Sequence, residues 1–94
     1  VTNNTIQNSS PTAFSLNSNS GAIDLDFTRN TVTNNGNGVF ITLENAAQGN
    51  FNISNNTFTQ NQSSGIDIRL SDSATATFNI NDNNIQQSGR RGID

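Results

Sequence analysis

Four asparagines recur at one fixed point of a repeat, and their spacing constrains the fold more than any other feature of the sequence. The intervals between them are 26, 26 and 27 residues. The four are Asn4, Asn30, Asn56 and Asn83. In each copy an apolar residue lies three positions before the asparagine, and another lies two positions after it. A unit of this length cannot bury its own apolar face and must stack on copies of itself. The spacing therefore predicts a solenoid.

Composition alone favours disorder rather than a globular domain. Asn, Ser, Thr and Gln make up half of the 94 residues, only 30% of the residues are hydrophobic, and the mean hydropathy is -0.59. Polar tracts of this kind are typical of disordered segments. Disorder predicts no fixed period for apolar residues, however, whereas the Val, Ile, Leu and Phe residues here follow the same repeat as the asparagines. We therefore expect an ordered repeat fold.

A second apolar set follows each asparagine after a polar loop, and it alternates with polar residues. Its members are Phe14 and Leu16; Val39, Ile41 and Leu43; Ile66, Ile68 and Leu70; and Ile93. A period of two indicates a strand. Each repeat also has one short apolar segment just before the asparagine and another just after it, so we expect three short strands per coil.

The repeated asparagine falls between the last two strands of each coil, where the chain must bend. Asn suits a bend because its short side chain tolerates the left-handed backbone region and can form local hydrogen bonds. Since stacked strands lie about 4.8 Å apart, each amide should also reach the next one, which predicts an inward asparagine ladder. Glycine before the alternating strand, at Gly38, Gly65 and Gly92, predicts a corner into which a larger side chain would intrude.

The combined pattern resembles a known family. Asn-Asn-x-apolar-x-x-Asn, a loop and Gly-apolar-x-Ile follow one another from Asn55-Asn56-Thr57-Phe58 through Gly65-Ile66-Asp67-Ile68. This is similar to the right-handed parallel β-helix repeat of the pectate-lyase-like superfamily and of many bacterial surface proteins. The resemblance covers the whole chain and implies an all-β fold of about three and a half coils. It leaves function open, since that superfamily includes polysaccharide lyases, glycoside hydrolases, uronate epimerases, adhesins and phage tail fibres.

We expect a single β-helix segment over residues 1–94, with coils at approximately 1–22, 23–48, 49–75 and 76–94. The sequence opens in the second strand of one coil, stops inside the first strand of another, and has neither an initiator methionine nor a signal peptide. This predicts a piece of a longer solenoid. Uncapped solenoid ends expose strand edges and apolar core, which predicts self-association, end to end or side by side.

Charge and residue usage limit the partners. Seven acidic residues against four basic residues give a net charge of -3, so no basic stripe can neutralise the phosphates of nucleic acid. No apolar run approaches the roughly 18 residues of a membrane span. The sequence contains no His and no Cys, which removes the usual zinc and nucleophile–base constellations, and we expect no cofactor. Stacking can replace the disulfides of small secreted domains, so an extracellular or cell-surface location suits a cysteine-free solenoid.

The outward side of the alternating strand is the face on which enzymes of the resembled family place their groove. Phe40 alternates with inward Val39 and Ile41 and is expected to point to solvent. A sugar ring could stack on it beside Asp67 and Arg69, so these three residues are a candidate saccharide contact. The alternative is an ordinary surface feature or a contact between subunits.

Carboxylates offer two further candidates. Asp24 and Asp26 share one strand face and are a candidate Ca²⁺ site, although no third carboxylate converges on them; a solvated pair is the alternative. Asp67 and Asp94 would stack on adjacent coils, near the lower end of the about 5 to 9.5 Å that glycoside hydrolysis requires. The sequence lacks polygalacturonase-like Asp-Asp, Gly-His-Gly and Arg-x-Lys motifs. These absences argue against catalysis within this segment and leave open an active site elsewhere in a longer parent chain.

The leading functional hypothesis is a structural or adhesive repeat segment of an extracellular or cell-surface β-helix protein, acting as a stalk, adhesin or filament subunit. The alternative is a carbohydrate-binding or carbohydrate-active β-helix. Its active site would lie on the first-strand face or outside this segment.

Overall fold

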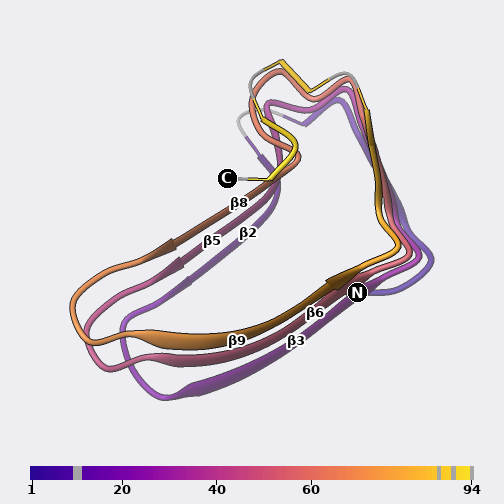
Figure 1. Ribbon diagram of the computed structural model, residues 1–94. Helices are drawn as coiled ribbons and strands as arrows, with labels where there is room; N and C mark the ends of the chain where they lie inside the picture. Colours follow the sequence, from indigo (N-terminus) through magenta and orange to yellow (C-terminus); the bar gives the residue numbers. More distant parts are fainter. Residues whose placement is uncertain (10–11, 87, 90, 94) are drawn as a thin grey trace.

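The computed structural model describes residues 1–9, 12–86, 88–89 and 91–93, and these residues form ten β-strands and no helix. The chain winds repeatedly around one interior, and strands of successive coils lie side by side (Figure 1). All pairings between these strands are parallel. The predicted all-β parallel β-helix, with three short strands per coil, is therefore confirmed.

Three sheets run along the axis, and each takes one strand from each coil. The β1 sheet contains β1 (Thr5–Gln7), β4 (Thr31–Thr33), β7 (Thr57–Thr59) and β10 (Asn84–Gln86). The β2 sheet contains β2 (Thr12–Ser18), β5 (Asn37–Leu43) and β8 (Ile66–Leu70). The β3 sheet contains β3 (Ala22–Thr28), β6 (Gln48–Ser54) and β9 (Thr75–Asn81). The strands of the β2 sheet are the predicted alternating strands. The four repeated asparagines lie between the β3 and β1 sheets.

Coil-to-coil register places like residues above one another in every sheet. Phe27 pairs with Ile53, which in turn pairs with Ile80. Val32 pairs with Phe58 in the same way. Because side chains alternate between the two faces of a strand, this register sends every member of an apolar column to the interior.

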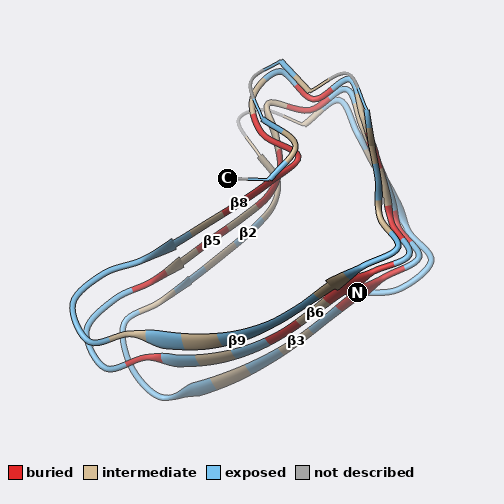
Figure 2. Ribbon diagram, viewed as in Figure 1, coloured by how far each residue is buried: buried red, intermediate tan, exposed pale blue. Residues whose placement is uncertain are grey.

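The interior is a stack of aliphatic and aromatic side chains, and its buried members lie between Phe27 and Ile66. They are Phe27, Val32, Val39, Ile41, Leu43, Ala47, Phe51, Ile53, Phe58 and Ile66. The rings of Phe27 and Phe58 are nearly parallel, with centroids 6.3 Å apart. Figure 2 shows the buried positions concentrated in the middle coils. Burial of each such side chain stabilises the fold by about 1.5–3 kcal/mol, so the stacked middle coils supply most of the apolar stabilisation.

Backbones approach closely at the glycine corner that precedes each β2-sheet strand. A Cβ at Gly38 would lie 2.2 Å from the carbonyl oxygen of Gly65, and a Cβ at Gly65 would lie 2.8 Å from that of Gly92. None of the three has a positive φ, so Gly38 and Gly65 are required by space rather than by backbone conformation. The predicted corner, into which a larger side chain would intrude, is confirmed at these two positions, whereas a Cβ at Gly92 would make only an ordinary contact.

Gly38→Ala is expected to lower the free energy of unfolding by about 1–3 kcal/mol, because the added methyl would overlap a neighbouring carbonyl. Urea denaturation followed by circular dichroism would measure the loss. Gly92→Ala is the matched control, since a Cβ there would meet Ile85 at 3.4 Å, an ordinary contact. Equal stability of the two variants would contradict the close packing of this corner.

Candidate functional site

The four repeated asparagines form a hydrogen-bonded ladder along the inside of the corner between the β3 and β1 sheets. In the middle of it, Asn56 Oδ1 accepts bonds from the backbone N–H of Asn30 at 2.8 Å and from Asn30 Nδ2 at 3.2 Å. Asn56 Nδ2 in turn donates to Asn83 Oδ1 at 3.0 Å and to the carbonyl oxygen of Phe27 at 2.8 Å. Asn4 donates to Asn30 Oδ1 with the same two groups. The predicted ladder is confirmed, and the polar groups of each central amide are satisfied in a buried place.

The left-handed backbone position lies one residue before each ladder asparagine. The residues there are Asn3, Arg29, Asn55 and Asp82, with φ between 52° and 58°. The ladder asparagines themselves have no positive φ, so the interpretation that they occupy the left-handed region is wrong. Arg29 gains nothing from a short amide side chain, yet adopts φ 54°. The bend is therefore imposed by the stacking of the ladder and its neighbours, and is only partly encoded by the residue that bends.

A second ladder follows five residues after the first, at the corner between the β1 and β2 sheets. Its hydrogen-bonded members are Ser9, Asn35 and Asn61, and Ser88 occupies the corresponding position of the last coil. Asn35 Oδ1 accepts the backbone N–H of Ser9 at 2.9 Å, and Asn35 Nδ2 donates to Asn61 Oδ1 at 3.2 Å. The Oγ of Ser88 is buried and has no hydrogen-bond partner in the described part of the chain. This ladder is not among the predicted features, although the last Asn of the Asn-Asn-x-apolar-x-x-Asn pattern is its signal in the sequence.

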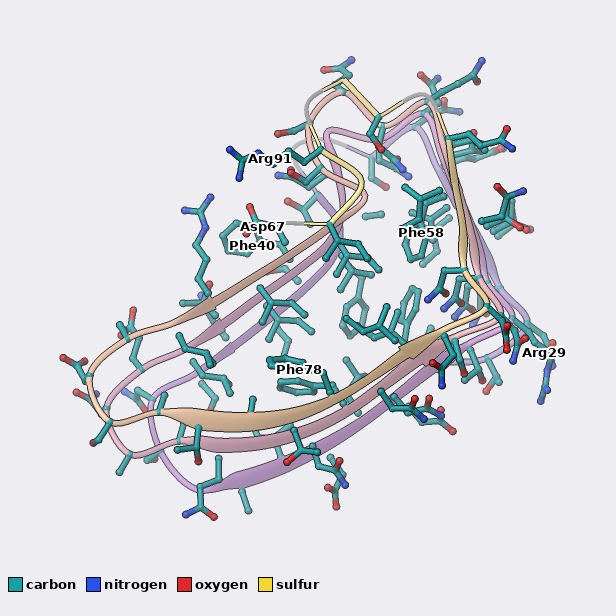
Figure 3. All side chains as sticks on the ribbon, viewed as in Figure 1. Arg29, Phe40, Phe58, Asp67, Phe78 and Arg91 are labelled. Atoms are coloured by element: carbon teal, nitrogen blue, oxygen red, sulfur yellow. The ribbon has the colours of Figure 1, made fainter. Side chains whose placement is uncertain are left out.

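Phe40, Asp67 and Arg69 come together on the outer face of the β2 sheet. Phe40 pairs directly with Asp67 on the neighbouring strand. Arg69 donates from Nε and Nη2 to the two oxygens of Asp67 at 3.2 and 3.0 Å, and its Cζ lies 4.9 Å from the centre of the Phe40 ring. Figure 3 shows Phe40 and Asp67 on the side of the coil away from the interior that holds Phe58. The geometry is a two-pronged ion pair combined with a cation–π contact.

The burial within this cluster differs from the sequence-based expectation. Phe40 is half-buried rather than fully directed to solvent, and the Arg69 guanidinium lies over its ring. Asp67 is only 4% exposed, whereas the Arg69 side chain is 60% exposed. A sugar stacking on this side of the Phe40 ring would have to displace Arg69. The cluster is therefore an outward arginine held by a buried carboxylate rather than an open aromatic platform.

The two aspartates of β3 have no third acidic residue gathered beside them in the described part of the chain. Asp24 and Asp26 are both exposed. Asp26 Oδ1 accepts a bond from Asn52 Nδ2 at 2.9 Å, and Asn52 Oδ1 accepts one from Asn79 Nδ2 at 3.5 Å. Among the described residues no three His, Cys, Asp or Glu side chains gather to hold a metal ion. Asp26 therefore terminates an outer chain of amides that runs along the β3 sheet.

The second candidate pair of carboxylates is Asp67 and Asp94. Asp94, proposed to stand above Asp67, lies outside the described residues.

An open depression of about 460 Å³ lies between the first and second coils. It is lined by Asn17, Ser18, Asn19, Ser20 and Glu44. Ser18 pairs with inward Leu43, so a polar residue interrupts the apolar column there.

Comparison with protein families, curated proteins and solved structures finds no match for this chain. Within the described residues there is also no helix long and apolar enough to cross a membrane. The arrangement of the residues themselves is thus the basis for any functional conclusion.

Asn56→Leu is expected to lower the free energy of unfolding by about 3 kcal/mol, because two buried donors of Asn30 lose their acceptor and each unpaired group costs about 1–3 kcal/mol. Urea denaturation would measure the loss. Asn50→Leu makes the same chemical change at an exposed position of β6 and should stay close to wild type. A neutral Asn56→Leu would show that the ladder does not stabilise the fold.

Proposed function

We propose that this chain is a load-bearing structural segment of an extracellular or cell-surface β-helix protein, serving as a stalk, adhesin or filament subunit. The observation that carries the proposal is the pair of internal ladders, which join each coil to the next through buried side-chain and backbone hydrogen bonds. The backbone hydrogen bonds of the three sheets also run from coil to coil, in the same direction as the bonds of the ladders. A force along the axis would load many such bonds together, which is the arrangement a rigid spacer needs.

The outer polar side chains support the same proposal because several bond to the next coil instead of converging on a cleft. Asn34 Nδ2 donates to Asn8 Oδ1 at 2.7 Å, and the hydroxyl of Thr59 donates to that of Thr33 at 3.0 Å. The sequence has no lysine and four arginines, so trypsin-like proteases find few cleavage positions. A surface of this kind suits exposure outside the cell.

Self-association is part of the proposal. In the last coil the exposed large apolar side chains are Leu70, Phe78 and Ile93, at 44%, 41% and 52%. The residues paired with the first two in the preceding coil, Leu43 and Phe51, are covered by the coil above them. A further coil, from the same chain or from a second copy, would cover this apolar layer and continue the three sheets.

Single-molecule pulling tests the structural role. With the segment placed between marker domains, we expect a resolvable unfolding force that falls in Asn56→Leu and is unchanged in Asn50→Leu, because only the first variant removes ladder bonds. Unfolding without resolvable resistance, or equal forces in both variants, would refute a load-bearing ladder.

The second candidate is carbohydrate binding, in keeping with the resemblance to the pectate-lyase-like superfamily, and it is favoured by the assembly of Phe40, Asp67 and Arg69 on one outer face. Thermal unfolding in the presence of acidic polysaccharides separates the two candidates. For a purely structural segment we expect no cleavage and no shift of the melting temperature. A stabilising shift that Phe40→Ala abolishes would instead support a saccharide site at this cluster.

A further inference from the structure

The second ladder contains a dipeptide with its own chemistry. Asn35 is followed by Gly36. In an Asn-Gly sequence the glycine nitrogen can attack the asparagine side-chain carbonyl carbon with little steric hindrance, since no Cβ stands in the way. Asparagine is for this reason one of the thermolabile residues of proteins. The same dipeptide recurs at Asn37-Gly38, which provides an internal comparison.

In the folded coil, both partners of that reaction are held by neighbouring residues. Asn35 is 1% exposed, and its Oδ1 accepts the Ser9 N–H at 2.9 Å. Its Nδ2 donates to the carbonyl oxygen of Ile6 and to Asn61 Oδ1, each at 3.2 Å. The N–H of Gly36 donates to the carbonyl oxygen of Ser9 at 3.0 Å. The nucleophile and the side-chain carbonyl are thus fixed to different partners, and water is excluded.

We propose that Asn35 is a latent modification site, a hydrolytic deamidation site that the second ladder closes in the folded protein and that becomes reactive when the coil opens. Once the ladder opens, the Gly36 nitrogen bonds to Cγ of Asn35, and Nδ2 leaves as ammonia with the proton of the Gly36 amide. Water then adds to one carbonyl of the resulting five-membered imide and breaks its bond to that nitrogen. The products are aspartate or isoaspartate, with one water consumed, one ammonia released and no change of oxidation state.

The product cannot rebuild the ladder. An aspartate at position 35 has no Nδ2 hydrogens, so its carboxylate would face two acceptors, the Ile6 carbonyl oxygen and Asn61 Oδ1, in a buried place. One carboxylate oxygen can keep the Ser9 N–H as a donor, but the other would face only these acceptors, and a buried charge that is only partly paired is strongly unfavourable. Isoaspartate also lengthens the main chain by one carbon and shifts the register of the coil. Opening of the coil is reversible, but deamidation of Asn35 is not. A chain that has opened and reacted therefore keeps the modified residue at position 35.

Asn37 provides the matched control. It is half-buried, and its Oδ1 accepts the Ser64 N–H at 3.3 Å. An aspartate oxygen can accept the same bond, so Asn37→Asp keeps the contact that the structure shows. Asn35→Asp, which makes the same chemical change two residues away, loses two buried donor interactions. Both variants add one negative charge. A difference in stability between them therefore reports the loss of the ladder bonds rather than the added charge.

The first test follows deamidation of the unmodified chain by peptide mapping and mass spectrometry, in native buffer and in urea at the same pH and temperature. We expect loss of the Asn35 amide to be at least about tenfold slower in the native protein, because reaction requires opening of the coil. Asn61→Ala removes one of the two acceptors of Asn35 Nδ2 and the acceptor of the Asn35 backbone N–H, so it should raise the native rate toward the urea rate. Asn50→Ala, at an exposed position, should not. Equal rates in native buffer and urea would overturn the proposal.

The second test compares thermal unfolding and refolding of Asn35→Asp and Asn37→Asp. We expect a large loss of melting temperature, or failure to fold, only in Asn35→Asp. Material aged in urea should lose its ability to refold in step with the modification at position 35. Gly36→Ala, which places a Cβ beside the attacking nitrogen, should slow loss of the Asn35 amide in urea, where packing in the folded coil plays no part. Equal melting temperatures for the two aspartate variants, or full refolding of chains modified at position 35, would also overturn the proposal.

Discussion

The bonds from the backbone N–H and side-chain amide of one asparagine to the Oδ1 of the next hold the coils together at two of their corners. A corner of a β-helix interrupts the sheets on either side of it, so its backbone groups would be buried without partners. Asparagine resolves this because its side chain carries both an acceptor and two donors. Asn56 illustrates the result, since it bonds to Asn30, Asn83 and the carbonyl oxygen of Phe27 at once. The polar backbone groups at these corners are therefore paired by asparagine side chains inside the coil, next to the apolar core.

Polar side chains on the outer surface also form hydrogen bonds between coils. In a chain that is half Asn, Ser, Thr and Gln, many polar groups are engaged coil to coil, as in the row of Asp26, Asn52 and Asn79. The cluster of Phe40, Asp67 and Arg69 differs, because it combines an aromatic ring, a buried carboxylate and an exposed guanidinium on one face. This cluster thus differs in chemistry from the row of amides on the β3 sheet, which consists of hydrogen bonds between coils.

Much of the architecture could be predicted because repetition makes one local pattern visible several times. The first ladder, the alternating strand and the glycine corner each rest on residues that recur at one position of the coil. The second ladder is harder to see in the sequence because serines, Ser9 and Ser88, occupy its position in the first and last coils, which hides the periodicity of Asn35 and Asn61. The sequence does not show which residue takes the left-handed position, because propensity favours asparagine there and both positions of the Asn55-Asn56 pair are asparagine.

The sequence by itself determined the period, the inward and outward columns and the candidate surface residues, because these depend on spacing along the chain and on the alternation of side chains in a strand. Only the tertiary structure decided how polar groups in different coils are paired. Whether Asn35 is reactive or protected, and whether Phe40 is open or lies under Arg69, depends on residues more than twenty positions away in sequence. Such contacts arise from the stacking of coils, and no local pattern specifies their geometry.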